Sequence, residues 1–225
     1  MKTFNKRRIK LIKFENIQIY GWEAALRGMR NPLNSWAKSD TNWEKFYSQK
    51  NDISRCIGEN DLSLMKRLAK AGTDHRKYLR MINVTVDIIA PLYWWKEADT
   101  YKIGTVCNSC STMHKVMEKE FTKEDFSTEH LDENNIFWQI IPELNKWRDK
   151  YLQSQSDVER KYYWWQIIQL LPTSYNQKRT VQFNYEVLYN IYKSRKEHKL
   201  DEWRFFCFIF ILKLPYFAKI FDIEA

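Results

Sequence analysis

The segment MINVTVDIIAPLYWWKEADTYKIGTVCNSCSTMHK, residues 81–115, contains three successive patterns that decide the fold. Apolar and polar side chains alternate from Ile82 to Ile88, which is typical of a half-buried β-strand. Ala90-Pro91 ends this strand, and the residues from Leu92 onward predict a helix directly after it. Residues 100–115 then bring together small, hydroxyl and thiol side chains. A strand, a helix and a small-residue loop in this order predict a fold that mixes strands and helices.

Further elements are predicted on both sides of this segment. Residues 9–20 alternate roughly between apolar and polar side chains and predict a first strand. The polar section from Lys115 to Gln155 predicts one or two amphipathic helices. Other helices are predicted over residues 22–30, 60–72, 157–171, 179–206 and 203–212. No repeat or low-complexity linker interrupts the chain, so we expect one α+β, mostly helical domain over residues 1–225.

Two of these helices have specific patterns. In the helix over 60–72, Asn60 or Asp61 is the expected cap, and one face carries Leu62, Met65 and Leu68. In the segment 179–206, residues near helical spacing are Val181, Tyr185, Leu188 and Tyr192. The pairs Trp94-Trp95 and Trp164-Trp165 fall inside apolar helical segments, which favours core packing for all four rings.

Composition narrows the class of protein. The 225 residues include ten Trp and 44% hydrophobic residues, enough apolar side chains to build a core. A net charge of +9 is compatible with a nucleotide, a nucleic acid or a membrane surface as partner. The basic N-terminus lacks a secretory pattern, and the apolar run over residues 205–212 is too short to span a bilayer. Four scattered cysteines do not form a disulfide framework. We therefore expect a cytoplasmic protein with no membrane partner.

The small-residue loop allows several interpretations. Cys107, Cys110 and His114 could offer three zinc ligands, but no second pair completes a structural site, so no metal is expected. A redox CxxC pair would lie between a strand and the start of a helix, whereas this pair follows a predicted helix. A tightly packed loop of small residues fits better than either. Aromatic and basic residues together also suit nucleic acid, but no nucleic-acid fold signature is present, so that partner is not expected.

Basic residues near the ends of predicted elements are the other candidates for an anion site. A single exposed arginine is usually solvated, but several that converge would hold a nucleotide through their planar forks. The candidates are Arg27, Arg30, Lys96, Lys102, Lys178, Arg179 and Arg195.

Two stretches together resemble flavin-dependent thymidylate synthases. That family has a strand ending in Ala-Pro, a helix, and a signature of the form R-H-R-x-x-S-x-N-E-x-S-x-R-Y. Here Lys102 stands at the third basic position and Ser111 at the second serine. Thr105 stands at the position of the first serine, and His114 stands at that of the tyrosine. Asn108 matches the asparagine if one residue is inserted before it.

The C-terminal half resembles the family more closely. Leu171-Pro172 is followed, without a gap, by Asn184, Asn190 and Arg195 at the family's positions. Glu197-His198 and Trp203 match the acidic-histidine turn and the tryptophan that follow. Upstream, the sequence AALRGMRNP is similar to the family's early helix with paired arginines.

The resemblance implies a flavin-dependent thymidylate synthase-like fold, a homotetramer, and FAD and dUMP as ligands. The implied reaction transfers a methylene group from methylenetetrahydrofolate to C5 of dUMP, with NADPH as reductant of the flavin. The candidate cofactor-binding residues are Tyr101, Lys102, Thr105, Asn184, Asn190 and His198. The candidate substrate-binding residues are Lys96, Glu97, Ser109, Ser111, Thr112 and Arg195, and Ser111 is also the candidate catalytic residue.

Departures from the signature leave a second function open. Thr100, Tyr101, Ser109 and Met113 stand where the family has arginine, histidine, glutamate and arginine. Loss of a phosphate-facing arginine removes a charge-assisted bond of about 1.5–3 kcal/mol, for which Lys96, Lys102 or Arg179 are candidate replacements. The sequence therefore predicts either a divergent flavin enzyme or a non-catalytic nucleotide-binding protein on the same fold.

Overall fold

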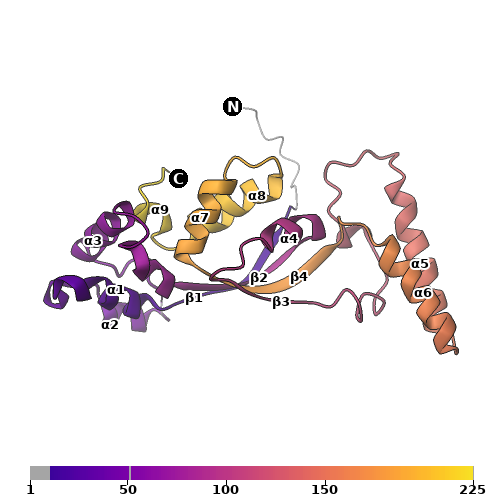
Figure 1. The fold of residues 1–225 in the computed structure, drawn as a ribbon, viewed down its shortest axis with the longest axis horizontal. Helices are drawn as coiled ribbons and strands as arrows, with labels where there is room; N and C mark the ends of the chain where they lie inside the picture. Colours follow the sequence, from indigo (N-terminus) through magenta and orange to yellow (C-terminus); the bar gives the residue numbers. More distant parts are fainter. Residues whose placement is uncertain (1–10, 51, 225) are drawn as a thin grey trace. The chain divides into compact units, whose positions relative to one another are not determined.

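The computed structural model describes residues 11–50 and 52–224 (Figure 1). The strands are β1 (Lys13–Tyr20), β2 (Asn83–Pro91), β3 (Val106–Ser109) and β4 (Asn176–Asn184). The α-helices are α1 (Trp22–Arg30), α2 (Trp43–Ser48), α3 (Glu59–Lys70), α4 (Leu92–Ala98), α5 (Phe137–Gln153), α6 (Asp157–Leu170), α7 (Tyr185–Arg195), α8 (Asp201–Phe205) and α9 (Phe217–Ile220). The shorter turns are η1 (Asn31–Leu33), η2 (Trp36–Lys38), η3 (Arg76–Met81), η4 (Lys123–Asp125), η5 (Phe206–Phe210, a π-helix) and η6 (Ile211–Lys213). About half of the chain is helical, which confirms the predicted α+β class.

The chain forms two compact units. The hairpin unit comprises residues 11–13, 88–100 and 108–180 of the described chain. The main unit comprises residues 14–50, 52–87, 101–107 and 181–224. The single domain expected from the sequence stays a prediction.

The strands form one antiparallel sheet in the order β1-β2-β4-β3. Strand β2 lies inside the sheet, and its alternation is as predicted: Val84, Val86 and Ile88 are fully buried, while Asn83 and Thr85 are half-buried. The first strand is confirmed over Lys13–Tyr20, and residues 9 and 10 of that prediction lie outside the described chain.

The helix predicted from residue 179 is wrong in its first part. Residues 176–184 form strand β4, in which Val181 and Phe183 are buried with the exposed Gln182 between them. This alternation and the β-branched and aromatic side chains suit a sheet better than a helix. The helix α7 begins only at Tyr185, where the side chain of Asn184 accepts a hydrogen bond from the backbone N–H of Val187 at 3.0 Å.

Aromatic packing dominates the core of the main unit. Trp22, at the start of α1, lies nearly perpendicular to the ring of Tyr185, with ring centroids 5.3 Å apart. On β1, Phe14 stacks on Phe210 of η5 at 4.8 Å. Gly21 is required between β1 and α1, because it has φ +88° and a Cβ there would lie 1.9 Å from the carbonyl oxygen of Met81.

The predicted cap of the helix α3 is wrong. Neither Asn60 nor Asp61 caps it, since the helix begins at Glu59 after Gly58. The backbone N–H groups of Asn60 and Asp61 instead donate to the carboxylate of Asp40, at 2.9 and 3.0 Å. The predicted face is also rotated: Met65 is fully buried, but the other buried apolar residues are Leu64 and Ala69, whereas Leu62 and Leu68 are half-buried.

Asp61 is instead the centre of a buried polar network. Its carboxylate accepts a hydrogen bond from Nε of Arg30 at 2.7 Å, and both side chains are almost completely buried. It also accepts bonds from the hydroxyls of Ser39 (2.8 Å) and Thr41 (2.6 Å) and from the backbone N–H groups of Asp40 and Thr41, each at 3.1 Å. One carboxylate therefore joins α1, α3 and the segment 39–41.

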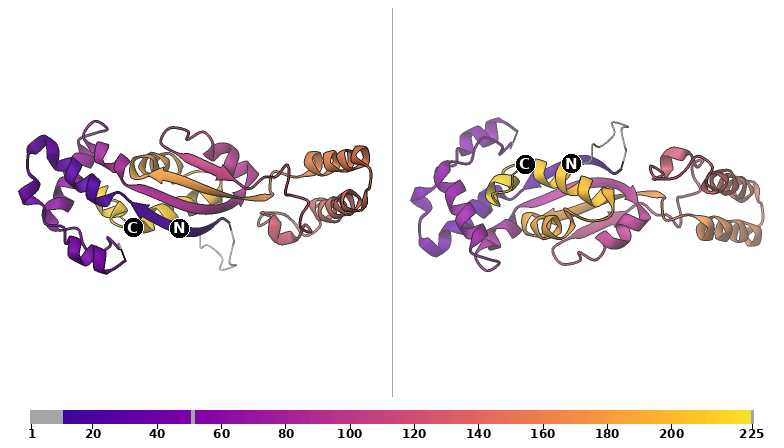
Figure 2. Two further views of the ribbon diagram at one scale, coloured as in Figure 1. Left: turned by 90° about the horizontal axis from the view of Figure 1, so that it is seen from below. Right: turned by 90° about the horizontal axis from the view of Figure 1, so that it is seen from above.

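In the hairpin unit, α5 and α6 lie side by side in all views (Figures 1 and 2). Between residues 115 and 155, α5 and η4 are the only helices in the described chain, and the rest of that section is irregular. Leu144 of α5 and Ile167 of α6 are fully buried. Trp165, in contrast, is 43% exposed, so the prediction of core packing is wrong for this ring, although it is confirmed for Trp94 and Trp95.

The helix predicted over residues 203–212 is confirmed in outline, because α8, η5 and η6 follow one another there. Its Phe206, Cys207 and Phe210 are buried. No helix within residues 11–50 and 52–224 is both long and apolar enough to cross a bilayer.

Candidate functional site

Arg195, at the end of α7, is held by two aromatic residues of the main unit. Its Nε donates a hydrogen bond to the phenolic oxygen of Tyr101 at 2.9 Å. The guanidinium carbon lies 4.9 Å from the ring centroid of Trp203 and 5.6 Å from that of Tyr101. The ring of His198 lies at a steep angle to Trp203, with centroids 6.4 Å apart. This aromatic clamp fixes a half-buried positive charge in one orientation.

The clamp also affects a neighbouring thiol. Burial raises the pKa of Cys207 to about 12, and the positive charge of Arg195 only partly opposes this. The thiol therefore stays protonated at neutral pH, which argues against a nucleophilic or redox role for it.

The loop that carries Tyr101 is fastened to the start of α7. Gly104 has φ +76°, and a Cβ there would lie 3.0 Å from the amide nitrogen of Asn184. That nitrogen donates a long hydrogen bond, 3.5 Å, to the carbonyl of Gly104. Within the loop, the hydroxyl of Thr105 donates to the carbonyl of Tyr101. The predicted cofactor residues Tyr101, Thr105 and Asn184 thus lie together, and Asn184 also has a structural role as helix cap.

A pocket of about 350 Å³ in the hairpin unit contains two of the predicted substrate-binding residues, Ser111 and Thr112. The hydroxyl of Ser111 accepts hydrogen bonds from the backbone N–H groups of Met113 (3.3 Å) and His114 (3.0 Å), which closes a turn. Residue Cys110 is fixed to β4, because its N–H donates to the carbonyl of Lys178 at 2.9 Å. The other lining residues are Lys13, Ile89, Lys119, Glu124, Asp125, Tyr175, Asn176, Gln177 and Lys178.

Three lysines make this lysine pocket suitable for an anion. Lys13, Lys119 and Lys178 line it together with two carboxylates, and Lys119 is paired with one of them, Asp125. The formal balance is positive, three against two. Beside them, burial above all, with a contribution from Asp125, raises the pKa of Tyr175 to about 12, so its phenol stays neutral. The pocket therefore offers positive charge and hydroxyl donors to a ligand.

The remaining predicted residues join neither group. Lys96 and Glu97 lie on the last turn of α4, and Ser109 lies on the exposed strand β3. Lys102 and Asn190 are exposed in the main unit. None of these five lines the lysine pocket.

The structure also identifies residues that the sequence did not assign. Lys13 and Lys119 come from separate segments and gave no recognisable signal, whereas Lys178 stood among the basic candidates. Arg179, a candidate replacement for the lost arginine, instead pairs with Asp99 at 2.7 Å and lies 4.4 Å from the ring centroid of Trp95.

The CxxC segment is an exposed strand rather than a tightly packed loop. Val106–Ser109 forms β3 at the edge of the sheet, and Cys107 and Cys110 are exposed. Edge strands expose side chains that an interior strand would bury, which explains the error. Within the described residues, no group of three or more His, Cys, Asp and Glu side chains is arranged to hold a metal.

The fold is similar to two crystal structures of the flavin-dependent thymidylate synthase ThyX from Helicobacter pylori, each with FAD and dUMP. The first gives a TM-score of 0.64 at 16% identity over 96% of this chain and 100% of the ThyX chain. The second gives 0.63 at 16% identity over 92% and 97%. No protein-family model and no curated protein matches the sequence. At this identity the similarity confirms the predicted fold, and FAD and dUMP are ligands of the H. pylori protein.

Proposed function

We propose that this chain binds a pyrimidine deoxynucleotide of the dUMP type, with the phosphate in the lysine pocket. The observation that carries this proposal is the meeting of Ser111 and Thr112 with Lys13, Lys119 and Lys178 around one pocket. A phosphate monoester carries up to two negative charges at neutral pH and accepts several hydrogen bonds, so it matches this set of donors. Ser111 then acts in binding, through the turn that it closes.

We propose FAD as the cofactor, on the basis of the fold and of the donors around Tyr101. The bond from Arg195 uses the phenolic oxygen as acceptor, which leaves the phenolic O–H able to donate. The amide nitrogen of Asn184 is engaged only by a 3.5 Å contact. These donors, with His198, fit the polar edge of a flavin, and the hydroxyl of Thr105, whose hydrogen is used within the loop, can only accept. Bound flavin, once reduced by NADPH, would supply the hydride that converts the methylene group transferred from methylenetetrahydrofolate into a methyl group.

A non-catalytic nucleotide-binding protein is the second candidate, and one observation favours it. The hydroxyl of Thr100 donates to the carbonyl of Glu97 at 2.7 Å, so this residue belongs to the turn that follows α4 and brings no charge to the loop. Tyr101 is bonded to Arg195, and Lys102 is exposed. The segment that carries cations in the flavin enzymes is thus largely committed to structure here.

Thermal denaturation with dUMP, FAD, both or neither separates the two candidates. A flavin enzyme is expected to be stabilised by FAD and further by dUMP, and its bound flavin should bleach with NADPH or dithionite. Saturation at about 100 times Kd would add about 2.7 kcal/mol to the free energy of unfolding. Stabilisation by dUMP alone would support the non-catalytic protein, and no response to dUMP would contradict both.

Lys178→Met tests the phosphate position. The substitution keeps most of the apolar stem but removes the charge, so we expect dUMP binding to weaken by about 1.5–3 kcal/mol. Calorimetric titration measures this, and the loss should shrink at high salt. Lys115→Met is the matched control, because Lys115 is exposed and pairs with Glu118 outside the pocket. Equal affinity in the two variants would place the phosphate elsewhere.

We further propose a homotetramer in the cytoplasm. Exposed apolar side chains on α6, which include Val158 (81% exposed) and Tyr162 (55%), supply surface for subunit contacts. None of the four cysteines, all of which lie in the described part of the chain, forms a disulfide, as a reducing compartment favours.

A further inference from the structure

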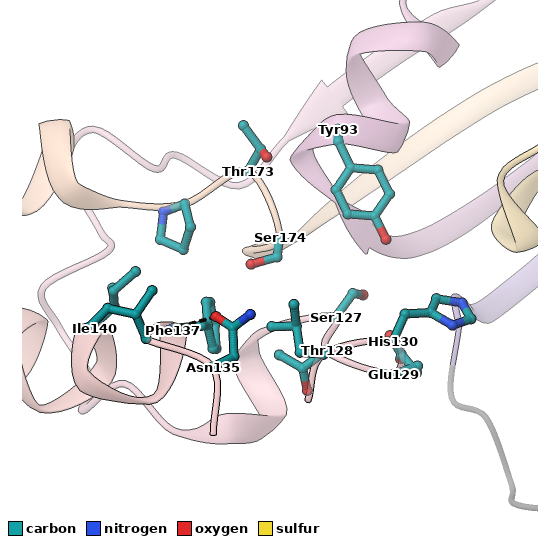
Figure 3. A pocket seen from close by; sticks show the side chains of 13 residues that line it. Tyr93, Ser127, Thr128, Glu129, His130, Asn135, Phe137, Ile140, Thr173 and Ser174 are labelled. Carbon is teal, nitrogen blue, oxygen red and sulfur yellow. Dashed lines mark hydrogen bonds between the residues drawn. The ribbon is translucent and has the colours of Figure 1, made fainter. Parts of the chain in front are cut away.

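A second pocket of about 450 Å³ lies in the hairpin unit, where the chain enters α5 and leaves α6 (Figure 3). Figure 3 shows Tyr93, Thr173 and Ser174 on one side of it and residues 127–130 with Asn135 on the other. It shares no lining residue with the lysine pocket. Its volume is within the range of pockets that enclose small organic ligands.

Backbone hydrogen bonds hold the walls of this pocket in place. The N–H of Ser127 donates to the carbonyl of Ser174 at 2.9 Å, and the N–H of Tyr93 donates to the carbonyl of Thr173 at 3.0 Å. The hydroxyl of Ser127 also donates to the side-chain oxygen of Asn176 at 2.9 Å. The three segments that line the pocket are therefore fastened to one another, and the space is preformed.

The charges around the pocket disfavour an anion. No lysine or arginine lines it, whereas the carboxylate of Glu129 does, and His130 is the one lining side chain that can carry a positive charge. The first turn of α5 is also closed to an anion: the N–H of Phe137 donates to the side chain of Asn135 at 2.9 Å, and the N–H of Trp138 donates to the carbonyl of Asn135 at 3.1 Å. A phosphorylated ligand would thus meet one negative charge and no compensating donor at the helix end.

The lining of the pocket combines polar and apolar residues. The hydroxyl oxygen of Ser174 is buried and has no hydrogen-bond partner in the described chain. A buried hydroxyl without a partner destabilises the folded chain, and a ligand that pairs with it would remove this cost. The apolar lining residues are Leu131, Ile136, Phe137, Ile140 and Pro172. The hydroxyls of a sugar alone would contact these apolar side chains without hydrogen-bond partners. A flat heterocycle would instead pack its ring face on them and direct a polar edge atom to the hydroxyl of Ser174.

We propose that this pocket binds an uncharged heterocycle of nucleoside size, separately from the phosphate-binding lysine pocket. The base would lie against Phe137 and Ile140, and one of its edge atoms would pair with the hydroxyl of Ser174. Thr128 and Thr173, at the pocket wall, offer hydroxyls to a sugar.

Uridine, which has no phosphate, is the probe, and saturation-transfer NMR on the full chain measures its binding. We expect saturable binding that Thr173→Trp abolishes by filling the pocket mouth. Ser174→Ala should weaken it about fivefold, as loss of one neutral hydrogen bond predicts. Gln139→Trp is the matched control, since Gln139 is exposed on α5 and does not line the pocket.

Lys178→Met distinguishes this site from the proposed nucleotide site. It should leave uridine binding unchanged while it weakens dUMP. Uridine binding that is lost in Lys178→Met but kept in Thr173→Trp would show that the nucleoside only enters the lysine pocket, and would overturn the proposal. Absence of uridine binding at millimolar concentration, or equal affinity in Ser174→Ala and the unaltered protein, would also overturn it.

Discussion

Asp61→Ala is expected to lower the free energy of unfolding by about 3–5 kcal/mol, the range for breaking a buried ion pair from one side. The substitution would leave the guanidinium of Arg30 buried without its carboxylate, 2.7 Å away in the unaltered chain. It would also remove the carboxylate that accepts hydrogen bonds from the hydroxyls of Ser39 and Thr41. Denaturant unfolding, followed by circular dichroism, measures the change.

The control for this variant is Asp222→Asn, because asparagine tolerates the left-handed φ of +50° at this position. Asp222 pairs with Lys66 at 2.8 Å and Lys70 at 2.6 Å, but all three side chains are well exposed. Exposed ion pairs contribute about 0–1 kcal/mol, so this variant should unfold almost like the unaltered protein. Similar losses in the two variants would contradict a special role for the buried network.

The same network predicts a dependence on pH. Burial alone would raise the pKa of Asp61. The hydrogen bonds from Thr41, Ser39 and Arg30, together with the positive charge of Arg30, outweigh this effect and lower the pKa. Because the folded pKa is below the unfolded one, the stabilisation is present above about pH 4 and is lost as the pH falls through the folded pKa. In Asp61→Ala this part of the acid sensitivity should disappear.

Local periodicity was enough to predict part of the fold. The alternation from Ile82 to Ile88 and the break at Ala90-Pro91 give β2 and the start of α4 correctly, because a strand with one buried face records its geometry in each second residue. Local periodicity failed to predict β4. Val181 is two residues from Phe183, as a strand face requires, but it is also four residues from Tyr185, which is close to helical spacing. The sheet neighbours that decide between the two readings lie far away in the sequence.

Tertiary contacts explain the other errors. The cap of α3 comes from Asp40, about twenty residues before the helix, so the helix's own sequence pointed to the wrong group. The lysine pocket collects Lys13, Lys119 and Lys178 from three separate segments, and spacing along the chain cannot indicate such a meeting. The resemblance assigned Ser111 and Arg195 to binding positions. It did not predict the hydrogen bond between Arg195 and Tyr101, which are 94 positions apart in the sequence.

The second large effect is expected on substitution of Arg195, which this hydrogen bond to Tyr101 holds in place. The resemblance implies that Arg195 contacts the pyrimidine nucleotide, and on that basis Arg195→Ala is expected to weaken dUMP binding by about 2–4 kcal/mol, the range for losing one partner of a desolvated charged contact. Folding should change little, because Arg195 is half-buried at the end of α7 rather than in the core.

Conservative variants distinguish binding from support. Arg195→Lys should recover little affinity, since an ammonium cannot reproduce a planar fork that is stacked near Trp203 and bonded to Tyr101. Tyr101→Phe keeps the ring but removes the hydroxyl, so it should cost only about 0.5–1.5 kcal/mol of binding. Lys193→Ala, an exposed position on the same helix, is the matched control and should bind dUMP normally. Calorimetric titration of the four variants, each checked by circular dichroism, measures the series. Unchanged dUMP affinity in a folded Arg195→Ala protein would show that the aromatic clamp holds this arginine for structure alone, because a guanidinium that contacts the nucleotide cannot be removed without loss of binding.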